Sequence, residues 1–419
     1  MNARVWGSVL LLTVVGILNY VDRELPYILA ESIKKDLVLS DTQLGFINGL
    51  GFLVIYAIAG LPLARLSDRG AYSRVIAGAV AFWSICTALG GLCQNAWQLA
   101  FARMGVAGGE AGSTPAAHAF VSSRFKADRR GLPLAVLSLA APIGAMLGLL
   151  GGGFLSHAVG WRATFVLMGL SGLILSPLVL LVVGADRSAR AATDLVPPAS
   201  IRGAIVQLLR NRSYRRLLIA SSVLALATFS VASFGPAFLM RSHAMGVREV
   251  GLTFGVAKGL LGACGLLLAG VVVDRLAAVD PRWTPRLPAI MLGLALPFSV
   301  VAWLASGTTM VVWCMAVANA VGLAYLAPTI SSVQRLTPPN LRAMGSAFLL
   351  LAVSLIGGLG PLIVGMISDA LEGDLGLGAL GRALFIVPIA QAFALFLFWR
   401  TGNDFMTDSH TERAGEDAH

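Results

Sequence analysis

Leu66-Ser67-Asp68-Arg69 is a charged turn between two apolar stretches, and Val272-Val273-Asp274-Arg275 repeats its pattern in the second half of the chain. The sequence holds two further pairs of matching patterns, Arg124-Phe125 and Arg129-Arg130 with Arg335-Leu336 and Arg342, and Ile143-Gly144 and Gly152 with Ile356-Gly357 and Gly365. Three matches in the same order favour an internal duplication over chance. They predict a molecule built from two similar halves.

The composition indicates a membrane protein. The chain of 419 residues is 57% hydrophobic and 12% charged, with a mean hydropathy of +0.80. Soluble domains carry about 25% charged residues. A membrane span needs about 20 apolar residues, so a chain of this length with short loops holds about twelve helices. The 47 glycines fit this prediction, because small residues let helix backbones approach closely in lipid.

Polar breaks in the apolar pattern place the transmembrane helices. We expect them at roughly 5–29, 43–66, 74–94, 96–120, 132–155, 163–184, 215–240, 249–273, 286–306, 309–334, 342–370 and 380–400. The prediction is an all-α membrane protein with an N-terminal six-helix bundle (1–184), a cytoplasmic linker (185–214), a C-terminal six-helix bundle (215–400) and a disordered tail (401–419). Matching bundles of this kind are typical of secondary transporters.

The basic residues are distributed unevenly between the loops. The loops on the side of both termini contain most of them, including the Arg129-Arg130 and Arg215-Arg216 pairs, whereas the opposite loops hold few. By the positive-inside rule, both termini and the linker are cytoplasmic. The net charge of +10 then follows from topology, and nucleic acid is not expected as a partner.

Other readings of the chain have less support. Residues 5–18 follow Arg4 as in a signal peptide, but no cleavage pattern follows them, so we assign them to the first helix. The four cysteines lie in apolar runs without ligand spacing, so neither a metal site nor a disulfide framework is expected. No cofactor is implied. A membrane-embedded hydrolase or transferase would need a nucleophile with a base or a metal cluster, and a non-transporting receptor would not explain two matching halves.

One turn resembles a family signature. Ala64-Arg65-Leu66-Ser67-Asp68-Arg69-Gly70, followed by Arg74, resembles the turn between helices 2 and 3 of the major facilitator superfamily. Ala64 replaces the usual leading glycine, and Arg74 alone stands for the trailing basic pair. With two six-helix halves and a long basic central loop, the resemblance covers nearly the whole chain and implies the major facilitator fold.

Charged residues near the cytoplasmic helix ends are candidates for gating. Such charge pairs, together with helix dipoles, can latch neighbouring helices. We expect this role for the residues of the turn and of its counterpart in the second half, namely Asp68, Arg69, Arg74, Asp274 and Arg275.

Two further stretches resemble the spinster family of lysolipid and sphingolipid transporters. They are Leu18-Asn19-Tyr20-Val21-Asp22-Arg23 and Arg103 through Pro115, with Gly109-Glu110-Ala111 at its centre. The resemblance implies a bacterial member, a monomer in the inner membrane, with Asn19 and Tyr20 at the substrate. Organic-anion symporters of the same superfamily carry a similar Asn-Tyr-x-Asp-Arg and a related glutamate motif, so a small carboxylate stays open as an alternative substrate.

Three charged residues lie inside apolar runs. Arg103 and Glu110 are seven residues apart on one face of a helix, about 10 Å along its axis. Asp22 lies about 24 Å up the first helix and Arg103 about 9 Å below the opposite membrane face, so the two reach similar depths. Charge at such depth is costly and functional by default. We therefore expect Asp22 and Arg103 to pair, with Glu110 as a second carboxylate in the same aqueous cavity.

This arrangement predicts coupling to protons through Asp22, Glu110 and Arg103. A low dielectric favours the protonated carboxyl, whereas a nearby arginine favours the ionised one. A moving arginine could therefore decide which carboxylate holds the proton, and could be released to an anionic substrate. The alternatives are a permanent Asp-Arg bridge without proton traffic and an arginine that only ties two helices together.

The second half offers fewer polar groups at membrane depth. Lys258 lies near the midplane of its helix, where it either meets an anionic group of the substrate or lines the cavity without contact. We also place Asn319 and Tyr325 at the substrate. Charges on one wall and mostly apolar residues on the other suit an amphipathic ligand.

The sequence therefore predicts a secondary transporter that works by alternating access. We expect proton-coupled symport of a lysophospholipid or sphingolipid-like substrate, with protons and membrane lipids as the other partners. A proton symporter for a small carboxylate is the alternative within the same fold.

Overall fold

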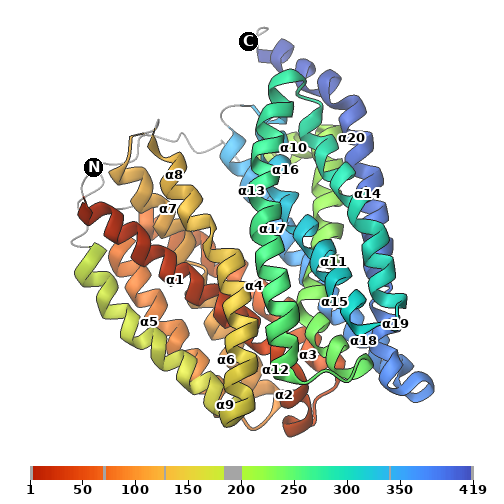
Figure 1. The fold of residues 1–419 in the computed structure, drawn as a ribbon. Coiled ribbons are helices and arrows are strands. Elements are labelled where there is room, and N and C mark those ends of the chain that lie inside the picture. Colours follow the sequence, from red (N-terminus) through yellow and green to blue (C-terminus); the bar gives the residue numbers. More distant parts are fainter. Residues whose placement is uncertain (1–2, 69–71, 127–128, 184–200, 339–340, 417–419) are drawn as a thin grey trace.

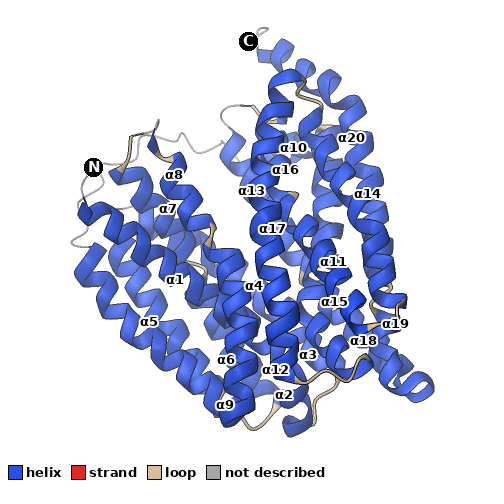
Figure 2. Cartoon of the chain, in the orientation of Figure 1, coloured by secondary structure: helices blue, strands red, loops and turns tan. Residues whose placement is uncertain are grey.

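The computed structural model describes residues 3–68, 72–126, 129–183, 201–338 and 341–416. Within these ranges the chain is helical, and short turns join the helices (Figure 2). The helices gather into two groups, one from each half of the sequence (Figure 1). The all-α architecture of two bundles is therefore confirmed.

The N-terminal group runs from α1 to α9. Its helices are α1 (Ala3–Ile28), α2 (Ala30–Leu37), α3 (Asp41–Asn48), α4 (Leu50–Asp68), α5 (Tyr72–Gly90), α6 (Ala96–Glu110), α7 (Ser113–Arg124), α8 (Gly131–Ser138) and α9 (Ala140–Val183). A break at Gly160, with a φ of 80° and a ψ of 165°, divides α9. Glycine adopts this backbone conformation readily because it lacks a Cβ atom, and the break separates the fifth and sixth expected helices.

The C-terminal group runs from α10 to α20. Its helices are α10 (Ile201–Arg210), α11 (Arg212–Ser242), α12 (Val247–Val250), the π-helical turn η2 (Gly251–Gly255), α13 (Val256–Val279), α14 (Trp283–Leu304), α15 (Thr308–Ala324), α16 (Leu326–Leu336), α17 (Arg342–Gly357), α18 (Leu359–Leu375), the 3₁₀ turn η4 (Gly376–Gly378), α19 (Ala379–Ala383) and α20 (Ile386–Glu416).

The lengths of the apolar segments account for the expected number of membrane passes. Eight segments are long and apolar enough to cross a membrane. Two of them, Gly131–Val183 with 53 residues and Met344–Phe405 with 62, have room for two passes each, at about 20 residues a pass. The pairs α6–α7 and α15–α16 supply one pass each. Together the described helices provide the twelve passes of the predicted fold.

The buried apolar residues show where the two groups meet. One core cluster joins both groups, for example Leu25 and Leu44 with Phe234 and Val364. The other two clusters are each confined to one group. In Figure 1 the groups converge at one end and diverge towards the end that carries both termini. We call these the closed end and the open end.

Glycines allow close contact between backbones at the closed end. A Cβ atom on Gly365 of α18 would lie 2.3 Å from the carbonyl oxygen of Asp41, and one on Gly45 of α3 would lie 2.2 Å from that of Pro361. Both contacts cross between the two groups. Small residues permit such approach of helices within a membrane, so the closed end is packed backbone against backbone.

The structure differs from the prediction in two polar segments. Residues 201–210 of the expected linker form α10, whose Ala204 and Leu208 pack onto the C-terminal core. Helix α20 continues to Glu416, where we expected a disordered tail from residue 401. Extending an existing helix costs less than nucleating one, and residues 401–416 contain no proline. Linker residues 184–200 lie outside the described ranges.

Candidate functional site

A partly buried ion pair joins α1 to α6. The Nε atom of Arg23 donates a hydrogen bond to Oε2 of Glu110 over 2.7 Å. The Glu110 side chain is fully buried. The hydroxyl of Ser113, the first residue of α7, donates to the carbonyl oxygen of Glu110. Glu110 is therefore held where the helix pair α6–α7 is interrupted.

Aromatic rings surround the guanidinium of Arg23. Its central carbon lies 4.6 Å from the ring centroid of Tyr56, 5.4 Å from that of Tyr20 and 5.7 Å from that of Phe52. The guanidinium of Arg103 lies 4.8 Å from the same Phe52 ring. Aromatic faces attract cations, so these rings help to hold the two positive charges of Arg23 and Arg103.

The structure corrects the expected pairing of Asp22 with Arg103. Nη1 of Arg103 donates to the backbone carbonyl oxygen of Asp22 over 3.2 Å, not to its carboxylate. The neighbouring arginine, Arg23, makes the carboxylate contact and takes Glu110 as its partner. Consecutive side chains diverge by about 100° around a helix. Asp22 and Arg23 therefore face different neighbours, which depth along the helix cannot reveal.

The carboxylate of Asp22 is buried, with 1% of the residue exposed. Neither of its oxygens forms a hydrogen bond with any residue that the structure describes. Trp83 and Thr87 of α5 lie beside it, and their polar atoms also form no hydrogen bond within the described ranges. Leaving a charged group without partners in such a place is expensive.

A second buried ion pair connects the two bundles. Nζ of Lys258, on α13, lies 2.7 Å and 2.8 Å from the two carboxylate oxygens of Glu24 on α1. Both residues are buried. Lys258 therefore lies at the interface between the bundles, and its charge is compensated by a residue that the sequence analysis did not assign.

A cavity of about 480 Å³ lies between the two bundles. The C-terminal bundle contributes an apolar wall with Gly262, Leu266, Leu326 and Ile330. The N-terminal bundle contributes apolar residues and a row of polar ones, namely Asn19, Tyr20, Ser113, Thr114, His118 and Ser138. A volume of this size suits a ligand of drug-like dimensions.

The polar end of the cavity leads to the buried charges. Tyr20 lines the cavity and also packs against the guanidinium of Arg23. Ser113 lines it as well and is bonded to the backbone of Glu110. Asn19 and Tyr20 line this cavity, and their contact with the substrate stays a prediction.

The remaining expected substrate residues lie elsewhere. Asn319 lines a small cavity of about 20 Å³ inside the C-terminal bundle, together with Thr228, Ser299 and Gln391. Tyr325 is buried in the C-terminal core, with its ring 6.4 Å from that of Phe398. Neither residue lines the larger cavity between the bundles.

The expected gating residues are only partly visible. Arg69 and the side chains of Asp68 and Asp274 lie outside the described part of the structure. Arg74, near the start of α5, and Arg275, in α13, are described and exposed. Gating by these residues stays a prediction.

Several charged residues escaped the sequence analysis. Arg23 was part of the quoted motif without a role, and Glu24 follows it directly. Arg241 and Asp369, at the closed end, lie close to expected loops, where charge is ordinary. For Glu24, the presence of a carboxylate within a membrane-spanning segment was a signal that could have marked it as a functional candidate.

The comparisons with known proteins agree with this geometry. The family described as the Major Facilitator Superfamily matches residues 12–361. The chain belongs to the major facilitator superfamily. This major facilitator is therefore a multi-pass membrane transporter and not an enzyme, as the sequence predicted.

Individual relatives narrow the placement within the superfamily. A protein named MFS-type efflux pump from Mycolicibacterium smegmatis is 45% identical over 406 residues, covering 97% of this chain and 94% of that protein. Protein spinster of Drosophila melanogaster is 26% identical over 382 residues, covering 87% of this chain and 62% of that protein.

A solved structure is also similar. It is a bacterial homolog of the human lysosomal transporter spinster in an inward-facing and unoccupied conformation. It matches this major facilitator with a TM-score of 0.84 at 26% identity, covering 97% of this chain and 99% of that one. The predicted resemblance to spinster is confirmed in sequence and in structure.

Proposed function

We propose that this transporter moves a lysophospholipid or sphingolipid-like anion across the bacterial cytoplasmic membrane, coupled to protons. Both termini lie in the cytoplasm under this proposal. The distribution of basic loops supports that orientation, and so does the similarity to an inward-facing structure, because the open end of this molecule carries the termini.

The main support for the proposal is the cavity between the two bundles. One wall is apolar, and the polar end leads through Tyr20 and Ser113 to Arg23, Arg103 and Glu110. An acyl chain can bury its surface against the C-terminal wall, while the anionic head group lies towards the guanidinium groups. Arginine suits such a head group because its planar fork matches phosphate and carboxylate geometry.

Under this proposal, the two buried carboxylates of Glu110 and Asp22 bind and release the transported protons. In this conformation Glu110 forms an ion pair with Arg23. Protonation of Glu110 would remove its charge and free Arg23 for the anionic group of the substrate. Asp22, whose oxygens lack partners among the described residues, would hold a second exchangeable proton. The anionic substrate and the ionised Glu110 would thus compete for Arg23, so a proton on Glu110 would favour substrate binding.

The mode of coupling is inferred from the Arg23–Glu110 pair and from the name of a relative. The Mycolicibacterium protein is named an efflux pump. Export driven by inwardly directed protons would require exchange, whereas binding of the substrate at Arg23 after Glu110 has taken up a proton is the order that symport requires. Competition between an anionic substrate and Glu110 for Arg23 therefore supports the symport expected from the sequence.

The proposal is tested in proteoliposomes that contain a pH-sensitive dye. Addition of a lysophospholipid should move protons across the membrane in the wild type. The signal should disappear in Glu110→Gln and in Asp22→Asn, because each removes one exchangeable carboxylate. Asp374→Asn, on the exposed part of α18, is the matched control and should retain the signal.

The same assay decides between substrate classes. A small dicarboxylate should give no signal if the substrate is an amphipathic lipid. Proton movement with the dicarboxylate alone would favour the organic-anion symporter instead. A lysophospholipid signal that persists in both carboxylate variants would contradict the proposed coupling residues.

A further inference from the structure

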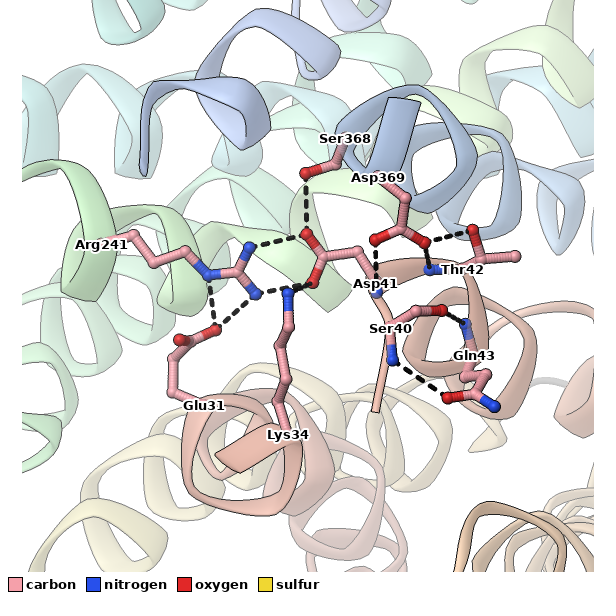
Figure 3. Close-up of polar contacts among 9 residues, drawn as sticks. All are labelled: Glu31, Lys34, Ser40, Asp41, Thr42, Gln43, Arg241, Ser368 and Asp369. Atoms are coloured by element: carbon pink, nitrogen blue, oxygen red, sulfur yellow. Dashed lines mark hydrogen bonds and ion pairs between the residues drawn. The ribbon is translucent and has the colours of Figure 1, made fainter. Parts of the chain in front are cut away.

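The closed end contains a polar network that crosses between the bundles (Figure 3). Its N-terminal members are Glu31 and Lys34 of α2 and Asp41 and Thr42 of α3. Its C-terminal members are Arg241 of α11 and Ser368 and Asp369 of α18. The superfamily assignment gives these residues no role.

Asp41 is the centre of the network. Arg241 donates to both of its carboxylate oxygens, over 2.6 Å and 2.7 Å, and Ser368 donates to one of them over 2.7 Å. Lys34, from the same bundle as Asp41, adds a contact of 2.8 Å. Only 1% of Asp41 is exposed. The Nε atom of Arg241 also binds Glu31 over 2.7 Å. Such two-pronged guanidinium–carboxylate contacts are strong and directional.

Asp369 makes a different kind of contact, because it binds the first turn of a helix in the other bundle. Its oxygens accept hydrogen bonds from the backbone amides of Asp41 and Thr42, over 2.9 Å and 2.8 Å. A third bond comes from the Thr42 hydroxyl over 2.6 Å. Ser40 satisfies the next amide, that of Gln43, from within the N-terminal bundle.

The first turn of α3 is therefore capped from both bundles. The first amides of any helix have no partner within the helix, and a negative charge there is also favoured by the helix dipole. Ser40 supplies one acceptor and Asp369 supplies two. Separating the bundles at this end would remove the cap that α18 provides, together with both contacts of Arg241.

We propose that Asp369 and Arg241 are positioning residues that hold the transporter in its inward-facing state, with Asp369 completing the helix cap of α3 across the bundle interface. Their contacts exist only while the closed end is closed. Each therefore shifts the equilibrium between the two access states towards the state seen here. This role is independent of the substrate and of proton coupling.

The glycine contacts place the polar network at the tightest contact between α3 and α18. Gly365 of α18 lies against the backbone of Asp41, one helical turn before Asp369. A small separation of α3 from α18 would therefore break the cap and the Ser368 contact together. The gate would respond in a switch-like manner, because hydrogen bonds weaken steeply with poor geometry.

The test measures the distance between the bundles by pulsed electron paramagnetic resonance, without substrate and without a pH gradient. Spin labels are placed at the exposed Leu92 and Leu377, near the closed end, after replacement of the native cysteines. Asp369→Ala should raise the ratio of open to closed distances at this end by about tenfold or more, the effect of losing one charge-assisted hydrogen bond. Arg241→Gln should act in the same direction.

Conservative variants and a control separate positioning from general damage. Asp369→Asn keeps the shape and one accepting oxygen, so it should give a smaller shift than Asp369→Ala. Arg241→Lys keeps the charge and loses the two-pronged contact, and should shift the ratio less than Arg241→Gln. Asp374→Asn removes a charge from the exposed end of the same helix and should leave the distances unchanged.

An unchanged distance distribution in folded Asp369→Ala would overturn the proposal. If that variant does not fold, Thr42→Val tests the same proposal, because it removes only the hydroxyl contact with Asp369. It should shift the ratio in the same direction by a smaller factor, and an unchanged distribution would again contradict the proposal. Loss of proton coupling in other variants has no bearing on this result.

Discussion

Arg23 and Glu110 illustrate how costly a single charge becomes when its partner is removed. The pair lies between α1 and α6 with a contact of 2.7 Å, and its carboxylate is buried while the Arg23 side chain is partly exposed. Breaking a buried pair by neutralising one member costs about 3–5 kcal/mol, whereas replacing both members by neutral groups is often tolerated. A variant of one residue therefore tests stability and transport together, and the double variant separates them.

Glu110→Gln should lower the free energy of unfolding, by less than the cost of about 3–5 kcal/mol for a fully buried pair, because the partly exposed Arg23 loses its carboxylate. The double variant Arg23→Gln/Glu110→Gln should recover most of that stability but no transport, since both the proton site and the anion site are lost. Thermal unfolding in detergent and flux in proteoliposomes measure the two quantities. Recovered transport in the double variant would show that this pair only holds the helices together.

The Lys258–Glu24 pair allows the same separation at the interface between the bundles. Lys258→Met should destabilise the protein by about 3–5 kcal/mol, because it leaves the Glu24 carboxylate buried and unpaired. Glu24→Gln/Lys258→Met should restore stability. If Lys258 also binds the substrate anion, the double variant should still bind lysophospholipid more weakly, as measured by titration calorimetry. Wild-type affinity in that stable variant would limit Lys258 to a structural role.

At the scale of elements, the interface of α3 and α18 depends on the absence of side chains. Gly45 and Gly365 bring backbone atoms of the two helices into direct contact. The polar network around Asp41 lies on the same interface. Close packing and polar contacts therefore stabilise the same conformation, and a side chain that keeps α3 and α18 apart should weaken both.

Gly365→Ala should shift the transporter away from the conformation seen here, in which the end that carries the termini is open. Its Cβ atom would lie 2.3 Å from the carbonyl oxygen of Asp41, and overpacking of this kind costs about 1–3 kcal/mol in the conformation that creates it. The fraction of molecules with an open Leu92–Leu377 distance should rise. Gly373→Ala is the matched control, because its Cβ atom would meet nothing within 4 Å. Equal distances in both variants would contradict this view of the interface.

At the scale of the whole molecule, the arrangement of cores determines how the transporter can move. The two bundles share one apolar core at the closed end and keep separate cores towards the open end. Movement of two rigid bundles about the cavity would exchange these roles, which is the behaviour expected of duplicated transporters. The separate cores would keep each bundle intact during the movement.

Labels at both ends should report opposite changes. Exposed positions at the open end are Lys126 in the N-terminal bundle and Arg342 in the C-terminal bundle. When lysophospholipid and a proton gradient drive transport, the Lys126–Arg342 distance should shorten while the Leu92–Leu377 distance lengthens. The within-bundle pair Leu92–Lys126 should stay constant. Parallel changes at both ends would rule out rigid-body movement about the cavity.

The sequence predicted most of the architecture because the relevant signals are local. The lengths of the apolar segments predicted the membrane passes, and the repeated turns predicted two halves. The structure shows both. The same hydropathy signal failed at residues 401–416, where polar residues continue α20 as a helix. Polarity excludes a segment from the membrane but does not by itself prevent a helix.

The charges show the limit of the sequence. Their presence at membrane depth marked Asp22, Arg103, Glu110 and Lys258 as important, because an ion in an apolar run is costly wherever it points. Their partners depended on the direction of each side chain around its helix and on which helix packs against that face. The amino-acid sequence by itself therefore determined the family, the passes and the buried charges. Only the tertiary structure decided that Glu110 pairs with Arg23, that Lys258 pairs with Glu24 and that Asp369 caps α3, because these contacts join residues that are distant in sequence and meet through helix packing.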